Sequence, residues 1–249
     1  PEAWLLNGAA GQVAERLTNE LRPFIHLNSP VHGIDQNAVG VTVHVGDDQQ
    51  IQAKSAIVAI PPPLRNKITF KPDLPAEMRA FLQRSPMGSM IKVFAIYPSA
   101  FWRGQNLNGF AVGNLKTLKL TADSSLPSGT PGILAAFVTA SEAVAFQQMT
   151  AAKQRQAVLD DLVAYWGPEA GLPEELIIHN WNQEAWSTGA FTSFVTPGAW
   201  TTYGQQWQQS HGRVHWAGTE ASSRWPGYFE GAIEAGIQAA NKAILQVES

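Results

Sequence analysis

One lysine interrupts a strongly apolar stretch in the middle of the sequence. Lys92 stands inside MIKVFAI (residues 90–96), where every other side chain is apolar. A buried ammonium group is costly to desolvate, so a lysine in such a place is rarely kept without a role. It can serve as a functional amine, or it can lie on an edge strand and extend its charge to water. Both interpretations stay open at this point.

A second stretch combines a glycine turn with a helix of small residues. In WAGTEASSRWPGYFEGAIEAGIQAANKAI (residues 216–244) a short strand runs into Gly218, and a helix is predicted to begin at about Tyr228–Glu230. The free N–H groups and positive dipole end of a helix N-terminus suit a phosphate or carbonyl oxygen. The Gly and Ala residues would let a flat ligand approach closely, but they would equally suit tight packing of the helix on a sheet.

Composition excludes several kinds of chemistry. The 249 residues are 45% hydrophobic and 15% charged, which is enough for a substantial core and for one large or two modest domains. A net charge of -3 gives no basic surface for nucleic acid. The absence of cysteine excludes disulfides, cysteine-ligated zinc, a thiol nucleophile and a cysteine bond to a cofactor. The six histidines show no metal-binding spacing, so no metal site is predicted.

The sequence also lacks the usual signs of a membrane or secreted protein. No apolar run reaches the roughly 18 residues of a membrane span, and neither an anchor nor a signal peptide is recognised. We therefore expect a cytoplasmic protein without a membrane anchor. The first residue is Pro1 rather than an initiator methionine, from which we expect a chain that lacks its beginning.

Hydrophobic periodicity predicts the elements that must position these residues. Helices are expected at residues 9–23, 73–83 and 150–167, and strands at 89–98, 109–112, 133–139, 175–183 and 213–218. Residues 39–60 are expected to form an outgoing strand, a Gly-Asp-Asp turn and a second, returning strand region. The last part of the second strand region, Ala56–Ile60, is apolar on both faces, as a central strand would be, and three prolines end it. No strand–GxGxxG–helix unit, P-loop, HExxH or GxSxG motif is present. The order is mixed, with too few alternating βα units for a complete doubly wound sheet.

The C-terminal stretch closely resembles the signature of the flavin-containing amine oxidases, the monoamine oxidase family. In that family a Gly-Thr-Glu turn lies by the FAD pyrophosphate, and Gly-Tyr-x-Glu-Gly begins a helix under the flavin ring. Other segments are similar to the family in the same order: PEAWLLNGAAGQVAERL (1–17), PVHGID (30–35), AIVAIPPPL (56–64), SPMGSMIKVFAIYPSAFWRG (85–104) and NWNQEAWSTGAFTSFVTPGAWTTYG (180–204). The resemblance covers most of this chain but only the C-terminal half of the family's sequence.

The resemblance implies a mixed α/β (α+β) fold. It comprises an incomplete, Rossmann-like FAD-binding domain of the glutathione-reductase type and a mixed-sheet substrate-binding domain. Residues 1–80 and 187–249 would belong to the first domain, and residues 81–186 to the second. FAD would be held non-covalently, because Ala190 occupies the position of the cysteine that joins the flavin in membrane-bound relatives. The dinucleotide fingerprint and the ribose-binding acid would lie in the missing N-terminal half, so this chain alone should hold FAD weakly or not at all.

The same resemblance assigns roles to individual residues. Lys92 would hold a water against flavin N5 and assist the reaction of reduced flavin with oxygen. Phe191 and Tyr228 would be the aromatic walls that flank the substrate amine, although either ring could instead belong to the core. The residues implied at the cofactor are Val31, Ala59, Pro61, Lys92, Trp181, Trp186, Ala190, Gly218, Thr219, Glu220, Gly227, Tyr228, Phe229 and Ala232. Glu220 would have to accept hydrogen bonds from backbone or water, since a carboxylate repels phosphate.

The implied activity is the oxidation of a primary or secondary amine to an imine, with FAD as cofactor and oxygen as acceptor, giving peroxide. The partners would be a small amine, oxygen and the N-terminal half of the same protein, with homo-oligomer formation left open. An amino-acid or polyamine oxidase and a flavin desaturase are alternatives on the same fold. A further alternative is a non-catalytic companion or scaffold chain that no longer holds flavin. Lys92, Tyr228 and the Gly-Thr-Glu turn together count against it.

Overall fold

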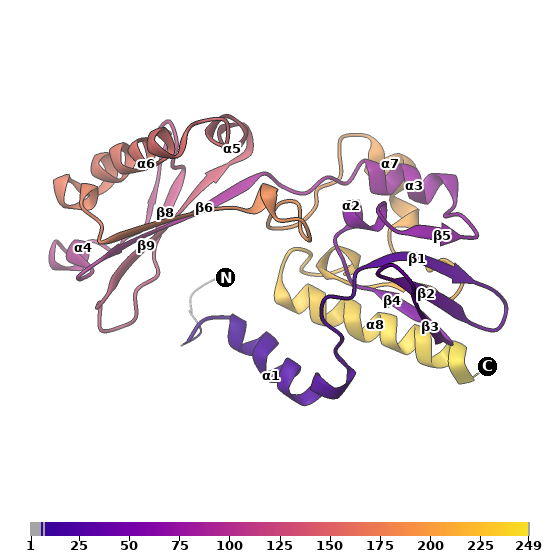
Figure 1. The fold of residues 1–249 in the computed structure, drawn as a ribbon. Helices are drawn as coiled ribbons and strands as arrows, with labels where there is room; N and C mark the ends of the chain where they lie inside the picture. The colour runs from indigo at the N-terminus through magenta and orange to yellow at the C-terminus, as the bar shows by residue number, and fades with distance from the viewer. Residues whose placement is uncertain (1–5, 7, 249) are drawn as a thin grey trace. The chain divides into compact units, whose positions relative to one another are not determined.

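The computed structural model describes residue 6 and residues 8–248, which divide into two compact units (Figure 1). Unit 1 consists of Pro1–Leu27 and Ser89–Trp181, and unit 2 consists of Asn28–Gly88 and Asn182–Ser249. Both units combine helices with sheets, which confirms the predicted mixed α/β class. The functional domain boundaries expected from the sequence differ from these units chiefly in the assignment of residues 1–27, and they stay a prediction.

Unit 1 is built on a five-stranded antiparallel sheet of order β10-β6-β9-β8-β7. Its strands are β6 (Met90–Tyr97), β7 (Ala111–Val112), β8 (Leu120–Asp123), β9 (Gly132–Thr139) and β10 (Glu175–Asn180). Its helical segments after residue 88 are α4 (Phe101–Gly104), α5 (Ala140–Phe146), α6 (Ala151–Trp166) and the 3-10 turns η2 (Pro168–Gly171) and η3 (Trp181–Gln183). Helices α5 and α6 cover one face of the sheet (Figure 1). The sequence did not predict β8 or α5. The strand expected at residues 175–183 is β10, which ends three residues earlier, at Asn180, where η3 follows.

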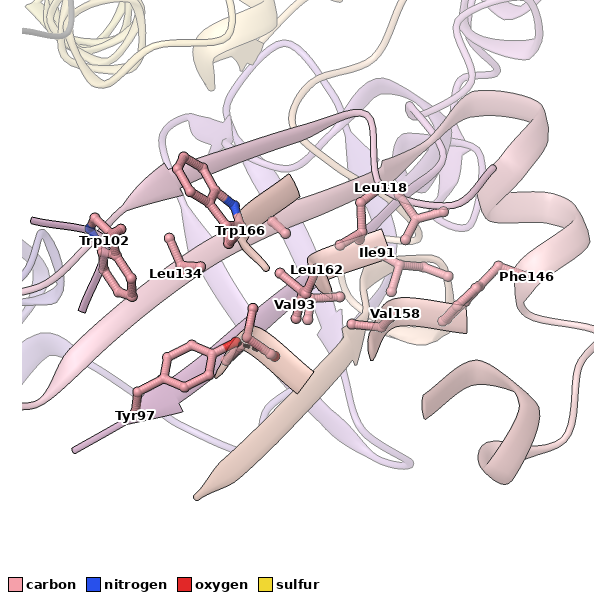
Figure 2. Close-up of a cluster of buried hydrophobic side chains, with 14 of the residues drawn as sticks. Ile91, Val93, Tyr97, Trp102, Leu118, Leu134, Phe146, Val158, Leu162 and Trp166 are labelled. Carbon is pink, nitrogen blue, oxygen red and sulfur yellow. Dashed lines mark hydrogen bonds between the residues drawn. The ribbon is translucent and has the colours of Figure 1, made fainter. Parts of the chain in front are cut away.

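The core of unit 1 lies against one face of β6, so buried and partly exposed residues alternate along most of this strand. Ile91, Val93, Ala95 and Tyr97 are all buried and pack with residues of α6 such as Leu162 (Figure 2). Successive strand residues point to opposite faces, so this set excludes Lys92 from the core. Tyr97 is satisfied within the core, because its Oη donates a hydrogen bond of 2.8 Å to the carbonyl of Ala170. The sheet therefore holds Lys92 on the face opposite to the α6 helix.

The N-terminal helix α1 (Gly11–Leu21), followed by the 3-10 turn η1 (Arg22–Phe24), confirms the helix predicted from the periodicity. Its apolar stripe is formed by Val13, Leu17 and Leu21, which are all exposed, and none of its residues is buried. An apolar stripe along a helix normally faces a partner surface.

Unit 2 contains a four-stranded sheet of order β3-β2-β1-β5 and a separate two-stranded parallel sheet, β11-β4. The strands are β1 (Val31–Gln36), β2 (Val41–Val45), β3 (Gln49–Ala53), β4 (Ala56–Val58), β5 (Thr69–Lys71) and β11 (Val214–Trp216). The helical segments are α2 (Pro62–Arg65), α3 (Ala76–Gln83), α7 (Ala199–Tyr203), η4 (Gly204–Gln206), η5 (Thr219–Ala221) and α8 (Phe229–Glu248). The core of unit 2 joins both sheets through side chains such as Ile34, Phe70 and Trp216.

Strand β4 differs from its prediction as a central strand over residues 56–60. It ends at Val58, and among the described residues its only strand partner is β11. Ile57 is therefore 43% exposed, although its sequence context resembles that of a strand buried on both faces. Parallel strands normally lie inside sheets that are covered on both sides, so this short pair has the character of a fragment of a larger sheet.

Candidate functional site

The candidate site in unit 2 begins where the parallel strands β4 and β11 end. Val58 pairs with Trp216, and the amide of Ala217 donates to the carbonyl of Val58 at 3.0 Å. The segments that follow the two strands therefore leave the sheet at the same edge. In parallel sheets, ligands bind outside this carboxyl edge.

Gly218 keeps the backbone uncrowded at this edge. Its φ of +95° is one that side chains rarely adopt, and a Cβ placed there would have no atom nearer than 3.8 Å. The three nearest atoms would belong to Glu220, Ala59 and Ile60. The backbone thus forms an uncrowded corner between the ends of β4 and β11.

Arg65, which the sequence analysis did not single out, ties this corner together. Its Nε donates to the carbonyl of Ile60 at 3.2 Å, and its guanidinium also donates to the carbonyl of Ala217 at 3.1 Å. The guanidinium lies 4.9 Å from the ring centroid of Trp216. Burial lowers the pKa of Arg65 to about 10, and the charge of Glu220 acts in the opposite direction. The only sequence signal is a basic residue directly after the proline-rich end of a strand.

The turn η5 carries two residues that reach in different directions. Thr219 Oγ1 accepts a hydrogen bond of 2.6 Å from the amide of Gly227 and donates one of 2.9 Å to the carbonyl of Tyr228. Glu220 is buried, and its Oε1 accepts hydrogen bonds of 3.0 Å from both the amide of Ser193 and the hydroxyl of Thr192. The expectation that Glu220 accepts from backbone is confirmed, while its placement near a pyrophosphate stays a prediction.

The two predicted aromatic walls are exposed in unit 2. Phe191 is 62% exposed and Tyr228 is 50% exposed, so neither ring belongs to the core of this chain. The Tyr228 ring meets Trp225 edge to face, with centroids 6.1 Å apart. A Cβ at Gly227 would approach the side chain of Thr192 to 3.4 Å, which brings the two aromatic segments side by side.

Helix α8 begins at Phe229, as predicted, and its small residues serve two purposes. A Cβ at Gly231 would collide with the carbonyl of Trp225, and Ala235 and Ala239 are buried, so these three positions serve close packing. By contrast, Gly236 has open space around it. Tight packing on the rest of unit 2 therefore accounts for Gly231, Ala235 and Ala239. The side of the helix that carries Gly236 stays free for a neighbour.

Lys92 and Trp181 belong to unit 1. Strand β6 lies between β10 and β9, so the interpretation of Lys92 as an edge-strand residue is wrong. The Lys92 Nζ lies 4.9 Å from the ring centroid of Phe94 and 5.5 Å from that of Phe137. Burial lowers the pKa of Lys92, which eases its conversion to the neutral amine. Trp181 packs edge to face against His179, with centroids 4.6 Å apart.

The structure gathers most of the remaining predicted residues around η5. Ala59 and Pro61 follow β4, and the amide of Ala190 donates to the carbonyl of Gly88 at 3.0 Å, next to the Thr192 segment. Val31, at the start of β1, pairs with Val45, and Trp186 is 74% exposed. Within the described part of the chain, no hydrogen bond or ring contact joins either residue to η5.

The described residues contain neither a metal-binding cluster nor a membrane-spanning helix. No group of three or more His, Cys, Asp or Glu residues there could hold a metal ion. No helix in the same residues is long and apolar enough to cross a membrane.

Comparison with known proteins assigns the family. The chain belongs to the flavin-containing amine oxidoreductases, whose family model matches residues 2–244. It is 42% identical to an L-amino acid dehydrogenase of Synechocystis sp. over 98% of this chain and 52% of that protein. It is 34% identical to the flavin-containing amine oxidase A of Equus caballus over 95% of this chain and 46% of that protein. The chain thus spans about half the length of the curated relatives it matches.

A solved structure supports the same assignment. The cyclohexylamine oxidase of Brevibacterium oxydans superposes with a TM-score of 0.92 at 32% identity, covering 97% of this chain and 53% of that one. The family resemblance and the fold expected from the sequence are therefore confirmed.

FAD is the cofactor that this family implies, and the η5 region fits it. The backbone of Gly218 is uncrowded at the carboxyl edge of the parallel strands, and exposed rings of Phe191, Tyr228 and Phe229 offer apolar surface. The buried Ser187 Oγ, on the same chain segment as Ala190, has no hydrogen-bond partner among the described residues. A bound group could satisfy such an atom. Which residues contact FAD stays a prediction.

Proposed function

We propose that the full-length protein oxidises a primary or secondary amine to an imine, using FAD and passing the electrons to oxygen as hydrogen peroxide. Bound FAD would supply a two-electron acceptor: the α-carbon of the amine would lose a hydrogen with its bonding electron pair and the nitrogen would lose a proton, which leaves a carbon–nitrogen double bond. The observation that carries the proposal is the pair of exposed aromatic segments, around Phe191 and Tyr228, joined to one turn at the carboxyl edge of β4 and β11. Family membership supports the reaction class.

In this proposal each part of the chain has a separate task. The rings of Phe191 and Tyr228 orient the neutral amine between them and stabilise positive charge that develops on it. The uncrowded corner at Gly218 and the start of α8 accept polar atoms of the cofactor. Lys92, with its lowered pKa and aromatic neighbours, would support the reaction of reduced flavin with oxygen by holding a water for it.

We also propose that this chain works together with the remaining half of the protein, as its coverage of about half of its relatives suggests. The isolated parallel pair β11-β4 has an exposed Ile57, and α8 exposes Ile233 and Ile237. Additional strands and helices would cover these faces. They would also supply the pyrophosphate and ribose contacts, for which this chain has no glycine-rich fingerprint.

A second candidate is oxidation of an L-amino acid, with an acceptor other than oxygen. It is favoured by the 42% identity to a protein named L-amino acid dehydrogenase, which exceeds the 34% identity to the amine oxidase. The two substrates differ in one group, because an amino acid carries a carboxylate that needs a cationic partner in the site.

A matched pair of substrates separates the two candidates. The flavin-loaded full-length protein is mixed with 2-phenylethylamine or L-phenylalanine, which differ only by the carboxylate. Flavin bleaching without oxygen reports substrate oxidation, and peroxide formation in air reports the acceptor. Bleaching and peroxide with the amine alone support the proposed oxidase. Bleaching by L-phenylalanine alone, with turnover only when an artificial acceptor is added, replaces it with the dehydrogenase. Failure of a wide panel of amines and amino acids to bleach the flavin refutes both.

A further inference from the structure

Two consecutive residues of the turn η5 hold the two aromatic segments of unit 2. Thr219 binds the Tyr228 segment through the amide of Gly227 and the carbonyl of Tyr228. Glu220 binds the Phe191 segment through the amide of Ser193 and the hydroxyl of Thr192. Because adjacent residues have a fixed separation, the turn couples the positions of both segments.

The Phe191 segment is clamped from two directions. On one side its backbone pairs with residue 88, since Ala190 donates to the carbonyl of Gly88 at 3.0 Å and Gly88 donates to the carbonyl of Thr192 at 3.1 Å. On the other side it meets the carboxylate of Glu220, which is only 8% exposed. Hydrogen bonds to a desolvated carboxylate are stronger than neutral ones, and losing one leaves a buried charge unsatisfied. Displacement of this segment is therefore strongly opposed.

We propose that Thr219 and Glu220 are positioning residues, which set the separation of the Tyr228 and Phe191 rings that flank the substrate. The proposal rests on the proposed function, because it takes these rings as the substrate walls. It gives Glu220 a task different from a contact with the cofactor pyrophosphate. Neither residue needs to touch substrate, since each acts through the backbone of the segment that it holds.

Kinetics of the flavin-loaded full-length protein test the Glu220 half of the proposal. Glu220→Ala should lower kcat/KM for the best substrate by about tenfold to a hundredfold, because displacement of a substrate wall by about 1 Å has effects of this size. Glu220→Gln keeps an oxygen acceptor for Ser193 and Thr192, so it should stay within about threefold of the wild type. Glu234→Gln is the matched control, because Glu234 bonds Ser222 and Arg224 instead of the aromatic segments.

A double-mutant cycle asks whether Glu220 acts through Phe191. In a Phe191→Ala background, Glu220→Ala should lower kcat/KM by less than about threefold, since the wall that Glu220 positions is already gone. Additive effects, accompanied by loss of FAD in the Glu220 variants, would assign Glu220 to the cofactor and overturn the proposal. A Glu220→Gln variant as impaired as Glu220→Ala would also overturn it, because the charge would then matter rather than the hydrogen bonds.

Amide hydrogen exchange gives a readout that does not need turnover. Glu220→Ala should accelerate exchange at residues 190–193 by about tenfold or more, because the amide of Ser193 loses a charged acceptor. Unchanged exchange there overturns the proposal. Faster exchange with unchanged kcat/KM overturns it as well, and leaves the oxidase function standing. If no amine or amino acid bleaches the flavin of the wild-type protein, the proposed function is refuted instead. Hydrogen exchange then still decides whether Glu220 holds the Phe191 segment.

The Thr219 half has its own pair of variants. Thr219→Val keeps the shape of the side chain but removes Oγ1, so exchange should rise by about threefold to tenfold at residues 225–228 and not at residues 190–193. Thr219→Ser restores the hydroxyl and should restore both exchange and kcat/KM. If Thr219→Val and Thr219→Ser change exchange and kcat/KM equally, Oγ1 of Thr219 does not hold the Tyr228 segment. That result would overturn the Thr219 half of the proposal.

Discussion

His215 on strand β11 and Gln246 in the last turn of α8 share a hydrogen bond of 3.1 Å between Nε2 and Oε1. Gln246 directs its amide nitrogen to the carbonyl of Gly212, so its oxygen faces His215 and must accept. The other ring nitrogen, Nδ1, lies 2.7 Å from the hydroxyl of Ser210 and accepts from it. His215 thus fastens the end of α8 to the parallel strand pair.

This arrangement predicts a loss of stability in mild acid. Desolvation lowers the pKa of His215 and Lys242 lowers it further, while the hydrogen bond to Gln246 opposes them. A folded-state pKa below the unfolded value means that stability is full above about pH 6.5 and is lost as pH falls through the folded pKa. The thermal unfolding midpoint should therefore fall more steeply between pH 7.5 and 5 in the wild type than in His215→Gln. Parallel pH profiles for the two proteins would contradict this, and His211→Gln is the control.

Lys92→Met in the full-length protein should slow the reaction of reduced flavin with oxygen by about a hundredfold and leave reduction by substrate nearly unchanged. In the proposed function Lys92 takes part only in the oxygen reaction, so the substitution removes a half-buried amine that only this half-reaction would use. Stopped-flow measurement of the two half-reactions checks this. Lys153→Met, at an exposed position on α6, is the control. An oxidative half-reaction that stays at the wild-type rate removes Lys92 from this role.

Acid precipitation of the full-length protein should release all of its flavin into the supernatant. Ala190 offers no side chain that could bond to the flavin, and this chain contains no cysteine. Absorbance of the supernatant and of the redissolved pellet measures the distribution. Flavin that stays with the polypeptide would show covalent attachment through another residue.

Tyr228→Ala should reduce amine turnover by about tenfold to a hundredfold while most of the FAD stays bound. The ring is half exposed, whereas the neighbouring backbone is held independently by Thr219. Tyr228→Phe keeps the ring and should lose much less activity. Steady-state rates and the flavin content of the purified variants provide the test. Activity within a few-fold of the wild type in Tyr228→Ala would exclude the ring as a substrate wall.

The 249-residue chain alone should bind FAD weakly or not at all and should oxidise no amine. The η5 region offers an uncrowded corner, but it has no glycine-rich loop that could compensate a pyrophosphate. The exposed stripes of α1 and α8 should also make the isolated chain associate. Calorimetry and flavin fluorescence during FAD titration measure the affinity. Tight stoichiometric binding with peroxide production would show that the other half is not required.

Periodicity in the sequence predicted the elements that have a buried face of their own, such as β6 with Val93 and Tyr97. For β4 it predicted a strand apolar on both faces and ending at Ile60, whereas the strand ends at Val58 and Ile57 is exposed in this chain. Strand β8 was not predicted because its LTAD sequence is short and carries little alternation. Local pattern also identified α1, none of whose residues is buried, and it missed α5, whose Ala143 and Phe146 are buried.

The site required more than local pattern. Resemblance selected Glu220 and Tyr228, but the partners of Glu220 lie 27 and 28 residues away, and Arg65 reaches Ala217 across 152 residues. No spacing rule connects residues so distant, since only the folded topology sets them together. Arg65 had only its place near the proline-rich end of a strand as a signal, and the resemblance included Thr192 and Ser193 in the segment 180–204 without singling them out.

The pairing of β6 with β10 has a consequence for how the chain reaches its native state. Ile91 and Asn180 are register partners, so the two ends of the segment 89–181 meet in one antiparallel pair. This segment contains a complete core of its own and can fold as an insertion before unit 2 forms. Once folded, it shortens the effective separation between β4 and β11, which lie on opposite sides of it in the sequence. The entropic cost of closing the loop between these two strands falls accordingly. We expect folding of the insertion to precede pairing of β4 with β11, and the slowest step to be the non-local one.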